Sequence, residues 1–328
     1  MKKISIIIPV YNVEKYIERA ILSALNQNFK DEEFEIIVVN DESPDNSVEI
    51  VENLMKQHAQ IKLFSQQNKG LGGARNTGIQ NAQGSYILFL DADDYLEKET
   101  LPKIIDHSIN NNLDILEFGA VGVTELKKEI YRKSITTDEV LDGYSYLNYY
   151  QYMNSACNKL YALDFLKKNK LYFKEQIFIE DFEFNTRAFY FAKRVRGIKT
   201  IVANFIQTTD SITRNKNVVK NEKMVFDIKE VIELILSFSK TIDRNNKMVG
   251  AVVNERVSFL IVTLLFTIFK FNISSKIRTA IIKELKKENL YPIKTIIKDK
   301  KKNIFRRLVN NEFIFNTSCD IKSFITNK

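Results

Sequence analysis

Cysteine and histidine are scarce in this sequence, with two of each among 328 residues. Cys157 and Cys319 show no pairing pattern, so we expect neither a disulfide framework nor a zinc site, and a reducing compartment is favoured. His58 and His107 fall in helices expected on the outside of the fold. Any proton transfer by this chain is therefore expected to depend on a carboxylate.

Signatures of several other protein classes are also missing. Neither a GxxxxGK phosphate loop nor a GxGxxG fingerprint occurs, which excludes the kinase and dinucleotide-binding classes that use them. The opening MKKISIIIPVYN has no small-residue cleavage site after its short apolar run, so a first β-strand is favoured over a signal peptide. The uncharged run at 257–269 has 13 residues and is too short to cross a bilayer as a helix.

Basic residues are concentrated near the C-terminus. The formal net charge is +8, yet residues 270–310 hold 13 Lys or Arg against 3 Asp or Glu, which leaves the rest of the chain near −2. Basic residues interleaved with Ile304 and Phe305 are typical of contact with anionic lipid, so we expect a membrane surface as a partner of 257–310. A buried helix followed by a solvated helix face is the alternative. No RNA-binding motif accompanies the segment, so no nucleic acid is expected.

Apolar strands and amphipathic helices are expected to alternate over the first 125 residues. The strands are expected at 4–10, 34–40, 61–66, 86–90 and 113–120, and the helices at 14–27, 45–58, from about 74, and 98–111. This pattern indicates an α/β fold with a mostly parallel sheet flanked by helices. From about residue 217 the chain is helical and lysine-rich. We therefore expect a catalytic domain at 1–215 and a smaller, mainly helical C-terminal region at 216–328.

A group of carboxylates ends the fourth expected strand, in YILFLDADDYL. Ligands of such sheets bind at the carboxyl ends of strands, where Tyr11 and Asp41 are also expected. Asp91 and Asp93 are spaced to hold Mg²⁺ or Mn²⁺ when substrate phosphates supply the other ligands. Taken alone, the pair more often indicates a solvated turn or a helix N-cap, and we interpret Asp94 as such a cap.

Several segments together resemble glycosyltransferase family 2 over about residues 4–215. They are SIIIPVYNVEKYIERAILSALNQ, EIIVVNDESPDNS, NKGLGGARNTGIQNAQGSYILFLDADD, ACNKLY and FIEDFEFNTRAFYFAK. The resemblance implies a GT-A, Rossmann-like fold. It also implies an inverting, metal-dependent transfer of a sugar from a UDP-sugar to a hydroxyl of a glycan or lipid-linked glycan, in cell-surface polysaccharide synthesis. Such an enzyme would act in the cytoplasm, peripherally at the inner face of the membrane.

The resemblance also implies roles for the acidic residues. Asp93 would bind Mn²⁺ or Mg²⁺ on the diphosphate, and Asp91 would lie against the ribose or the water shell of the metal. Asp181 would be the general base, with Glu180 pointing elsewhere on the same helix. At 156–161, Lys159 is either a phosphate or acceptor contact or a solvated lysine.

The nucleotide-sugar site implied by the resemblance consists of Pro9, Tyr11, Asp41, Arg75, Asp91, Ala92, Asp93, Ser211 and Arg214. Asp41 would accept a hydrogen bond from the uracil ring, although Glu42 stands where the family usually has glycine. Tyr11 would pack on the base, or simply end a strand, and Arg75 would contact the nucleotide, or be a solvated helix arginine. Many enzymes of this fold have a late histidine as a metal ligand, and none follows His107.

A non-catalytic function is the alternative to transfer. A degenerate transferase-like module would use the basic C-terminal region to bind a membrane or a polymer. Asp93 and Asp181 are both present, which favours the enzyme. An oligomer is compatible with either function.

Overall fold

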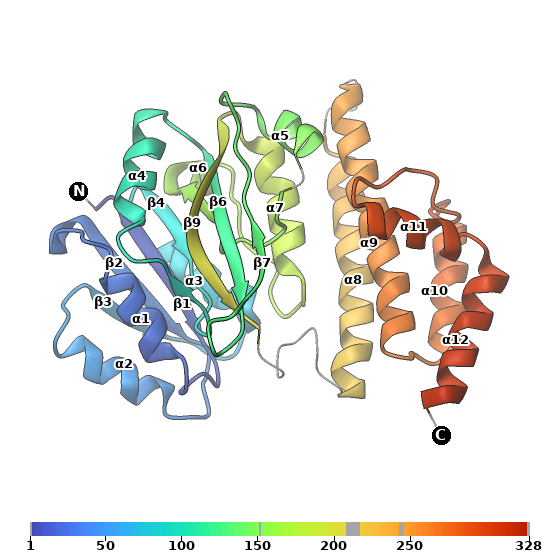
Figure 1. The fold of residues 1–328 in the computed structure, drawn as a ribbon, viewed down its shortest axis with the longest axis horizontal. Coiled ribbons are helices and arrows are strands. Elements are labelled where there is room, and N and C mark those ends of the chain that lie inside the picture. The colour runs from blue at the N-terminus through green and yellow to red at the C-terminus, as the bar shows by residue number, and fades with distance from the viewer. Residues whose placement is uncertain (1, 151, 208–216, 243–245, 327–328) are drawn as a thin grey trace. The chain divides into compact units, whose positions relative to one another are not determined.

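Among the described residues, nine strands form one sheet within the unit Met1–Thr208 (Figure 1). The structure is a computed structural model that describes residues 2–150, 152–207, 217–242 and 246–326. The strands are β1 (Ile4–Val10), β2 (Phe34–Asn40), β3 (Ile61–Ser65), β4 (Tyr86–Phe89), β5 (Tyr95–Leu96), β6 (Ile115–Val123), β7 (Glu129–Lys133), β8 (Lys159–Ala162) and β9 (Val195–Ile206). Their order is β3-β2-β1-β4-β8-β6-β9-β5, and β7 pairs with β6.

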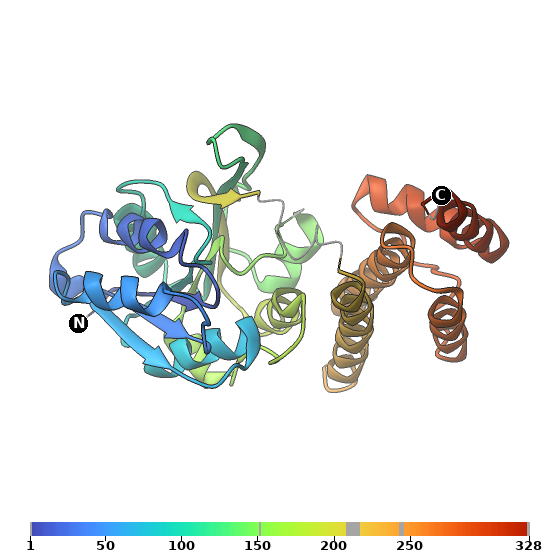
Figure 2. The ribbon, with the colours of Figure 1, turned by 90° about the horizontal axis from the view of Figure 1, so that it is seen from below.

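Helices flank this sheet (Figures 1 and 2). They are α1 (Ile17–Leu25), α2 (Ser47–Met55), α3 (Gly70–Asn81), α4 (Leu101–Asn110), α5 (Gly143–Tyr149), α6 (Leu163–Lys168) and α7 (Glu180–Phe191), with a short 3₁₀ turn at Asp31–Glu33. The fold class is the expected one, a sheet covered by helices. On α1 the buried face contains Ile17 and Ile21, whereas Leu22 is 40% exposed.

The first four strands form the expected parallel half of the sheet. β1 pairs in parallel with β2 and β4, and β2 with β3. Every residue of β1 and β4 is buried, as is typical of a parallel strand covered on both faces. Because Val10 lies opposite Asn40, the residues that follow these strands come to the same edge. Tyr11, Asp41 and Asp91 are placed there.

The second half of the sheet departs from the mostly parallel expectation. β8 pairs antiparallel with both β4 and β6, and β5 pairs antiparallel with β9. The sheet as a whole is therefore mixed. β5 has two residues and was not expected, because it is too short to leave a periodic signal. It directly follows the acidic residues at 91–94.

The glycine-rich segment after β3 is helical. α3 begins at Gly70, earlier than the expected start near Ala74. Gly70 has φ +73°, which glycine adopts without a steric penalty. A Cβ at Gly72 would lie 2.5 Å from the carbonyl oxygen of Lys174. The glycines thus allow the first turn of α3 to lie against the segment that leads to α7.

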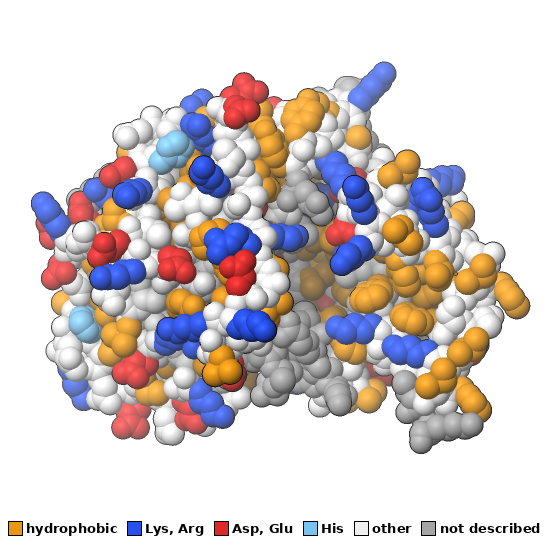
Figure 3. Space-filling model, viewed as in Figure 1, with side chains coloured by type: hydrophobic (Ala, Val, Ile, Leu, Met, Phe, Trp, Pro, Cys, Tyr) orange, Lys and Arg blue, Asp and Glu red, His pale blue; other side chains and the backbone are white. Residues whose placement is uncertain are grey.

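The described part of the unit Thr209–Lys328 is helical. Its helices are α8 (Val218–Ser239), α9 (Lys247–Lys270), α10 (Ser275–Lys287), α11 (Lys300–Val309) and α12 (Glu312–Thr326). The expected domain boundary near residue 215 lies outside the described residues. On the face seen in Figure 3, hydrophobic and basic side chains both lie over this unit.

The apolar run at 257–269 belongs to α9, which has 24 residues. The run alone is too short to cross a bilayer, but α9 as a whole is the one helix in the described part of the chain that is long and apolar enough. Within the structure, 67% of its most apolar window is buried. Burial of this extent is typical of the core helix of a bundle.

Candidate active site

The acidic turn after β4 is fixed by its backbone. The amide of Asp94 donates to the Asp91 carbonyl at 3.0 Å, and the guanidinium of Arg19 donates to the Asp93 carbonyl at 2.6 Å. The Asp94 carboxylate accepts from the amide of Ile206 at 2.7 Å. Asp94 therefore joins the turn to the end of β9. The expectation that it caps the following helix is wrong, because α4 begins later in the chain.

Asp91 and Asp93 supply the two other carboxylates of the turn. Burial and repulsion from Asp91 raise the pKa of Asp93 to about 6, and a cation at this turn would oppose this rise by favouring the ionised carboxylates. Among the described residues, no group of three or more His, Cys, Asp or Glu side chains is arranged to hold a metal ion. The two carboxylates fit Mn²⁺ or Mg²⁺ only with further oxygen ligands from a bound diphosphate and water.

Arg75 on α3 joins the acidic turn to the start of α7. Its guanidinium donates to Asp91 Oδ1 at 2.8 Å, to Glu180 Oε1 at 2.7 Å and to Asp181 Oδ1 at 2.5 Å. A further contact reaches Cys157 Sγ at 3.5 Å. Three carboxylates from two distant segments thus surround one guanidinium.

The sequence left two alternatives for Arg75, a contact with the nucleotide and a solvated helix arginine, and its surroundings differ from both. The side chain is 1% exposed, and its guanidinium carbon lies 5.8 Å and 5.2 Å from the ring centroids of Phe89 and Phe173. It is therefore no solvated helix arginine. Both terminal nitrogens are engaged by protein acceptors, so in this structure Arg75 positions carboxylates and presents no free terminal nitrogen to a nucleotide.

Glu180 and Asp181 share the Nη1 nitrogen of Arg75. Ile179, just before α7, has φ +58°, which is rare for a β-branched residue and turns the chain so that both carboxylates reach the arginine. Burial, with repulsion from Asp181, raises the pKa of Glu180 to about 7. Burial also raises the pKa of Asp181, against the attraction of Arg75. The expectation that Glu180 points elsewhere on the helix is wrong.

The loop before β8 fixes the second oxygen of Asp181. The amide of Ala156 donates to Asp181 Oδ2 at 2.9 Å. Lys159 supports this loop, because its ammonium donates to the carbonyls of Met153 and Ser155 at 2.7 and 2.8 Å. Lys159 is fully buried, and burial lowers its pKa. It is therefore not a solvated lysine, and its ammonium binds carbonyls of the loop where the other alternative was a phosphate or acceptor contact.

Asp41 lies at the carboxyl end of β2 and is 3% exposed. Its Oδ1 accepts from the Gln66 side chain at 2.7 Å and from the Lys69 amide at 2.8 Å, which fixes the start of α3. Its Oδ2 has no partner among the described residues. Glu42 has φ +65°, so it adopts the left-handed backbone conformation at the position where the family usually has glycine. For a residue with a side chain, this conformation costs about 1 kcal/mol of conformational free energy.

The remaining residues predicted for the nucleotide site differ in how far they are exposed to solvent. Pro9 is buried in β1 opposite Val39, Ala92 is 4% exposed and Tyr11 is 52% exposed. Tyr11 is therefore the one of these three that presents a large surface. Ser211 and Arg214 lie outside the described residues.

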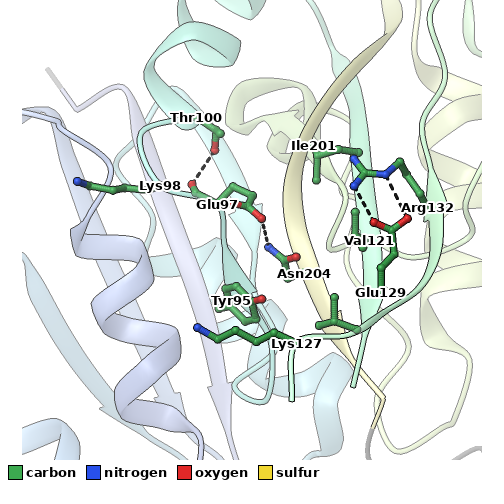
Figure 4. Close-up of a pocket in the computed structure, with 11 residues that line it drawn as sticks. Tyr95, Glu97, Lys98, Thr100, Val121, Lys127, Glu129, Arg132, Ile201 and Asn204 are labelled. Atoms are coloured by element: carbon green, nitrogen blue, oxygen red, sulfur yellow. Dashed lines mark hydrogen bonds and ion pairs between the residues drawn. The ribbon is translucent and has the colours of Figure 1, made fainter. Parts of the chain in front are cut away.

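A hollow of about 450 Å³ lies on the sheet next to Tyr95, the residue after the acidic turn (Figure 4). Its walls come from β5, β6, β7 and β9. Figure 4 shows the ion pair of Arg132 with Glu129 on one wall and the carboxylate of Glu97 on another. None of the predicted site residues lines this hollow.

Three contacts at the site were not predicted from the sequence. They are made by the Arg19 guanidinium, the Ala156 amide and the Cys157 thiol. The segment ACNKLY carried a signal for the last two, because it was already part of the family resemblance. Arg19 is an ordinary position of an amphipathic helix and left no signal.

Comparison with known proteins identifies a family and several glycosyltransferase relatives. The family model described as Glycosyl transferase family 2 matches residues 5–182. The uncharacterized glycosyltransferase EpsJ of Bacillus subtilis (strain 168) is 34% identical over 217 residues, which cover 64% of this chain and 62% of EpsJ. The poly(ribitol-phosphate) beta-N-acetylglucosaminyltransferase TarS of Staphylococcus aureus (strain MW2) is 33% identical over 60% of this chain and 34% of TarS. The chain thus spans less than two thirds of these relatives.

Solved structures show the same fold. Residues 1–349 of S. aureus TarS, in complex with UDP-GlcNAc, align with a TM-score of 0.67 and 23% identity over 95% of this chain and 91% of that one. The mannosyltransferase PcManGT of Pyrobaculum calidifontis, in complex with GDP-Man and Mn²⁺, aligns with a TM-score of 0.55 and 12% identity over 99% and 88% of the two chains. At these identities the likeness concerns the fold alone.

Proposed function

Because the chain belongs to glycosyl transferase family 2, we propose that it transfers a sugar from a UDP-sugar to a hydroxyl of a glycan or lipid-linked glycan in cell-surface polysaccharide synthesis. The observation that carries the proposal is the cluster around Arg75. This single guanidinium bonds Asp91 of the donor-side turn and Asp181 of the base-side helix. A degenerate, non-catalytic module has no need to hold these two carboxylates together.

The uridine part of the donor is assigned to the edge formed by β1 and β2. Asp41 Oδ1 is used by the protein, which leaves Oδ2 to accept the ring N–H of uracil. Cytosine presents no N–H at that position, so a carboxylate there favours uridine. Tyr11 follows β1 next to Asp41 and is exposed enough to pack on the base. The complex of S. aureus TarS with UDP-GlcNAc supports a uridine donor.

The diphosphate is assigned to the acidic turn with Mn²⁺ or Mg²⁺. Asp93 and Asp91 would hold the ion, which supplies neutralisation of the charge that develops on the leaving nucleoside diphosphate. Arg19 and Asp94 keep the turn in shape through its backbone. The complex of PcManGT with GDP-Man and Mn²⁺ supports a metal in this fold.

The acceptor hydroxyl is assigned to Asp181 as general base. Arg75 and the Ala156 amide each bond one oxygen of this carboxylate and hold it in one orientation. The remaining lone pairs are available to accept the hydroxyl proton while the hydroxyl oxygen attacks the anomeric carbon. Attack opposite the leaving diphosphate inverts the anomeric configuration. Lys159 acts indirectly, as a positioning residue, through the loop that presents Ala156.

The acceptor and the compartment are parts of the same proposal. Relatives named as poly(ribitol-phosphate) glycosyltransferases act on a polymer, which supports a glycan acceptor here. Cys157 and Cys319 are both free, which fits the reducing cytoplasm, where we place the enzyme at the membrane.

Calorimetric titration of UDP, GDP and CDP tests the donor assignment. We expect UDP to bind most tightly in Mn²⁺ and more weakly in EDTA, because the diphosphate then lacks the ion bridging it to Asp93. A preference for GDP or CDP would refute the uridine assignment. Equal UDP affinity in Mn²⁺ and EDTA would refute the metal role.

A further inference from the structure

The outward side of α12 is apolar. Five large side chains on it are exposed by 46–78%, namely Phe313, Ile314, Ile321, Phe324 and Ile325. At 3.6 residues per turn these positions fall within an arc of roughly 120° on the helix surface. The other side of α12 buries Phe315 and Cys319. The helix is therefore apolar on two opposite sides, of which only one packs into the bundle.

The outward side of α11 mixes apolar and basic residues. Ile304 and Leu308 are exposed, and Lys300, Lys301 and Arg307 are exposed on the same side of the helix. None of these three cations forms an ion pair with a residue in the described part of the chain. The two acids of α12 are already engaged with α10, since Glu312 pairs with its Lys286 and Asp320 with its Arg278.

The two outward sides belong to one layer of the C-terminal unit. α11 packs against α9 and α12, and α11 and α12 lie on the same side of the unit in both ribbon views (Figures 1 and 2). On that side, Figure 3 shows hydrophobic and basic side chains intermingled. A face with this many exposed large apolar side chains is unusual where a protein meets only water.

We propose that the outward faces of α11 and α12, here called the docking face, bind the surface of an anionic lipid bilayer. The apolar side chains of α12 would enter the boundary between headgroups and acyl chains, while Lys300, Lys301 and Arg307 meet lipid phosphates. The sequence predicted membrane contact through 257–310. The structure moves the contact, because residues 257–269 lie in the buried helix α9 whereas the docking face extends to residue 325.

Charge decides between a bilayer and a second copy of this chain. Residues 300–326 contain six Lys or Arg and two Asp or Glu, and both acids already have partners within the unit. Two copies meeting through this face would bring like charges together. An anionic bilayer instead accepts the apolar side chains and neutralises the cations. This inference adds a contact surface to the proposed location at the membrane, and it does not depend on the proposed sugar transfer.

Co-sedimentation of the full chain with vesicles tests the proposal. We expect binding to phosphatidylcholine–phosphatidylglycerol vesicles, weaker binding at high salt, and little binding to phosphatidylcholine alone. The triple variant K300Q/K301Q/R307Q should bind roughly a hundredfold more weakly, at the usual contribution of each basic residue near an anionic surface. The variant F313S/I321S should weaken binding by a similar factor, because apolar burial is lost.

The matched control is K276Q/K283Q/K287Q on α10, which removes the same charge from three exposed lysines. This variant should bind nearly as tightly as the wild type. All the substituted residues are exposed, and circular dichroism checks that each variant folds. The proposal is overturned if the wild type ignores anionic vesicles, if the α10 control loses as much affinity as K300Q/K301Q/R307Q, or if F313S/I321S binds normally. It is also overturned if light scattering shows that the docking face joins two copies and vesicles are not bound.

Discussion

Replacing Glu180 by glutamine tests the carboxylate cluster around Arg75. The substitution keeps the shape of the side chain and an oxygen that can accept from the arginine Nη1. It imitates the protonated carboxyl. Burial and the neighbouring Asp181 raise the pKa of Glu180 to about 7, from an ordinary value of 4.5. In wild-type protein at neutral pH this group is therefore close to half protonated.

The direction and the size of the expected change in the free energy of unfolding follow from this pKa shift. Between pH 4.5 and 7 the folded chain retains a proton on Glu180 that the unfolded chain releases, so the free energy of unfolding falls as the pH rises. A shift of this size corresponds to about 3 kcal/mol. E180Q has no such group. Relative to the wild type, the variant should gain stability progressively across this window, by up to about 3 kcal/mol above pH 7, with no gain at pH 4.5.

Urea unfolding in EDTA at a series of pH values measures this difference. Tyrosine fluorescence reports mainly the N-terminal unit, because 13 of the 14 tyrosines lie before residue 209. The matched control, Glu175→Gln, changes an exposed glutamate shortly before α7 and should leave the pH profile parallel to the wild type. If the E180Q profile also runs parallel to the wild type, the arrangement described for Arg75, Glu180 and Asp181 is incorrect.

Three further predictions concern single side chains. Asp93→Ala should weaken UDP binding in Mn²⁺ but not in EDTA, as calorimetry can show; an equal loss in both would contradict the metal role. Asp41→Asn should weaken UDP roughly ten- to a hundredfold, since a hydrogen bond to a charged group contributes roughly 1.5–3 kcal/mol, and unchanged affinity would remove the uracil assignment. Lys159→Met should lower the free energy of unfolding by roughly 3–5 kcal/mol, because the buried carboxylate of Glu117 loses its nearby cation. The exposed control Lys168→Met should change it little.

The parallel half of the sheet could be predicted from the sequence because its signals are local. β1, β2 and β4 are largely apolar runs, interrupted by Ser5 in β1 and Glu35 in β2, and Tyr11, Asp41 and Asp91 follow closely after them. The rule that ligands bind at carboxyl ends of strands then places Asp41 and Asp91 at one edge without any tertiary information. The same rule identified the acidic turn as the candidate site.

The roles of Arg75 and Lys159 could not be predicted, because they depend on tertiary contacts. Nothing in the local sequence distinguishes a buried lysine that binds carbonyls of Met153 and Ser155 from a solvated one. Arg75 and Asp181 are far apart in the chain, so their ion pair leaves no periodic signal. The antiparallel pairing in the second half of the sheet could not be predicted either. β5 is too short to leave a periodic signal, and β8 pairs with strands that are distant in the sequence.

The central claim is that Asp181 is the base of a transfer from a UDP-sugar. The most direct measurement compares wild type and Asp181→Asn in two ways, by UDP release from a panel of UDP-sugars with acceptor and by the Kd for UDP. We predict that turnover falls by roughly 10²–10⁴, the usual range for general-base catalysis, while the Kd stays nearly unchanged because the proposal assigns Asp181 to the acceptor side. Near-normal turnover of the variant, or a turnover loss matched by an equal loss of UDP affinity, would contradict the account.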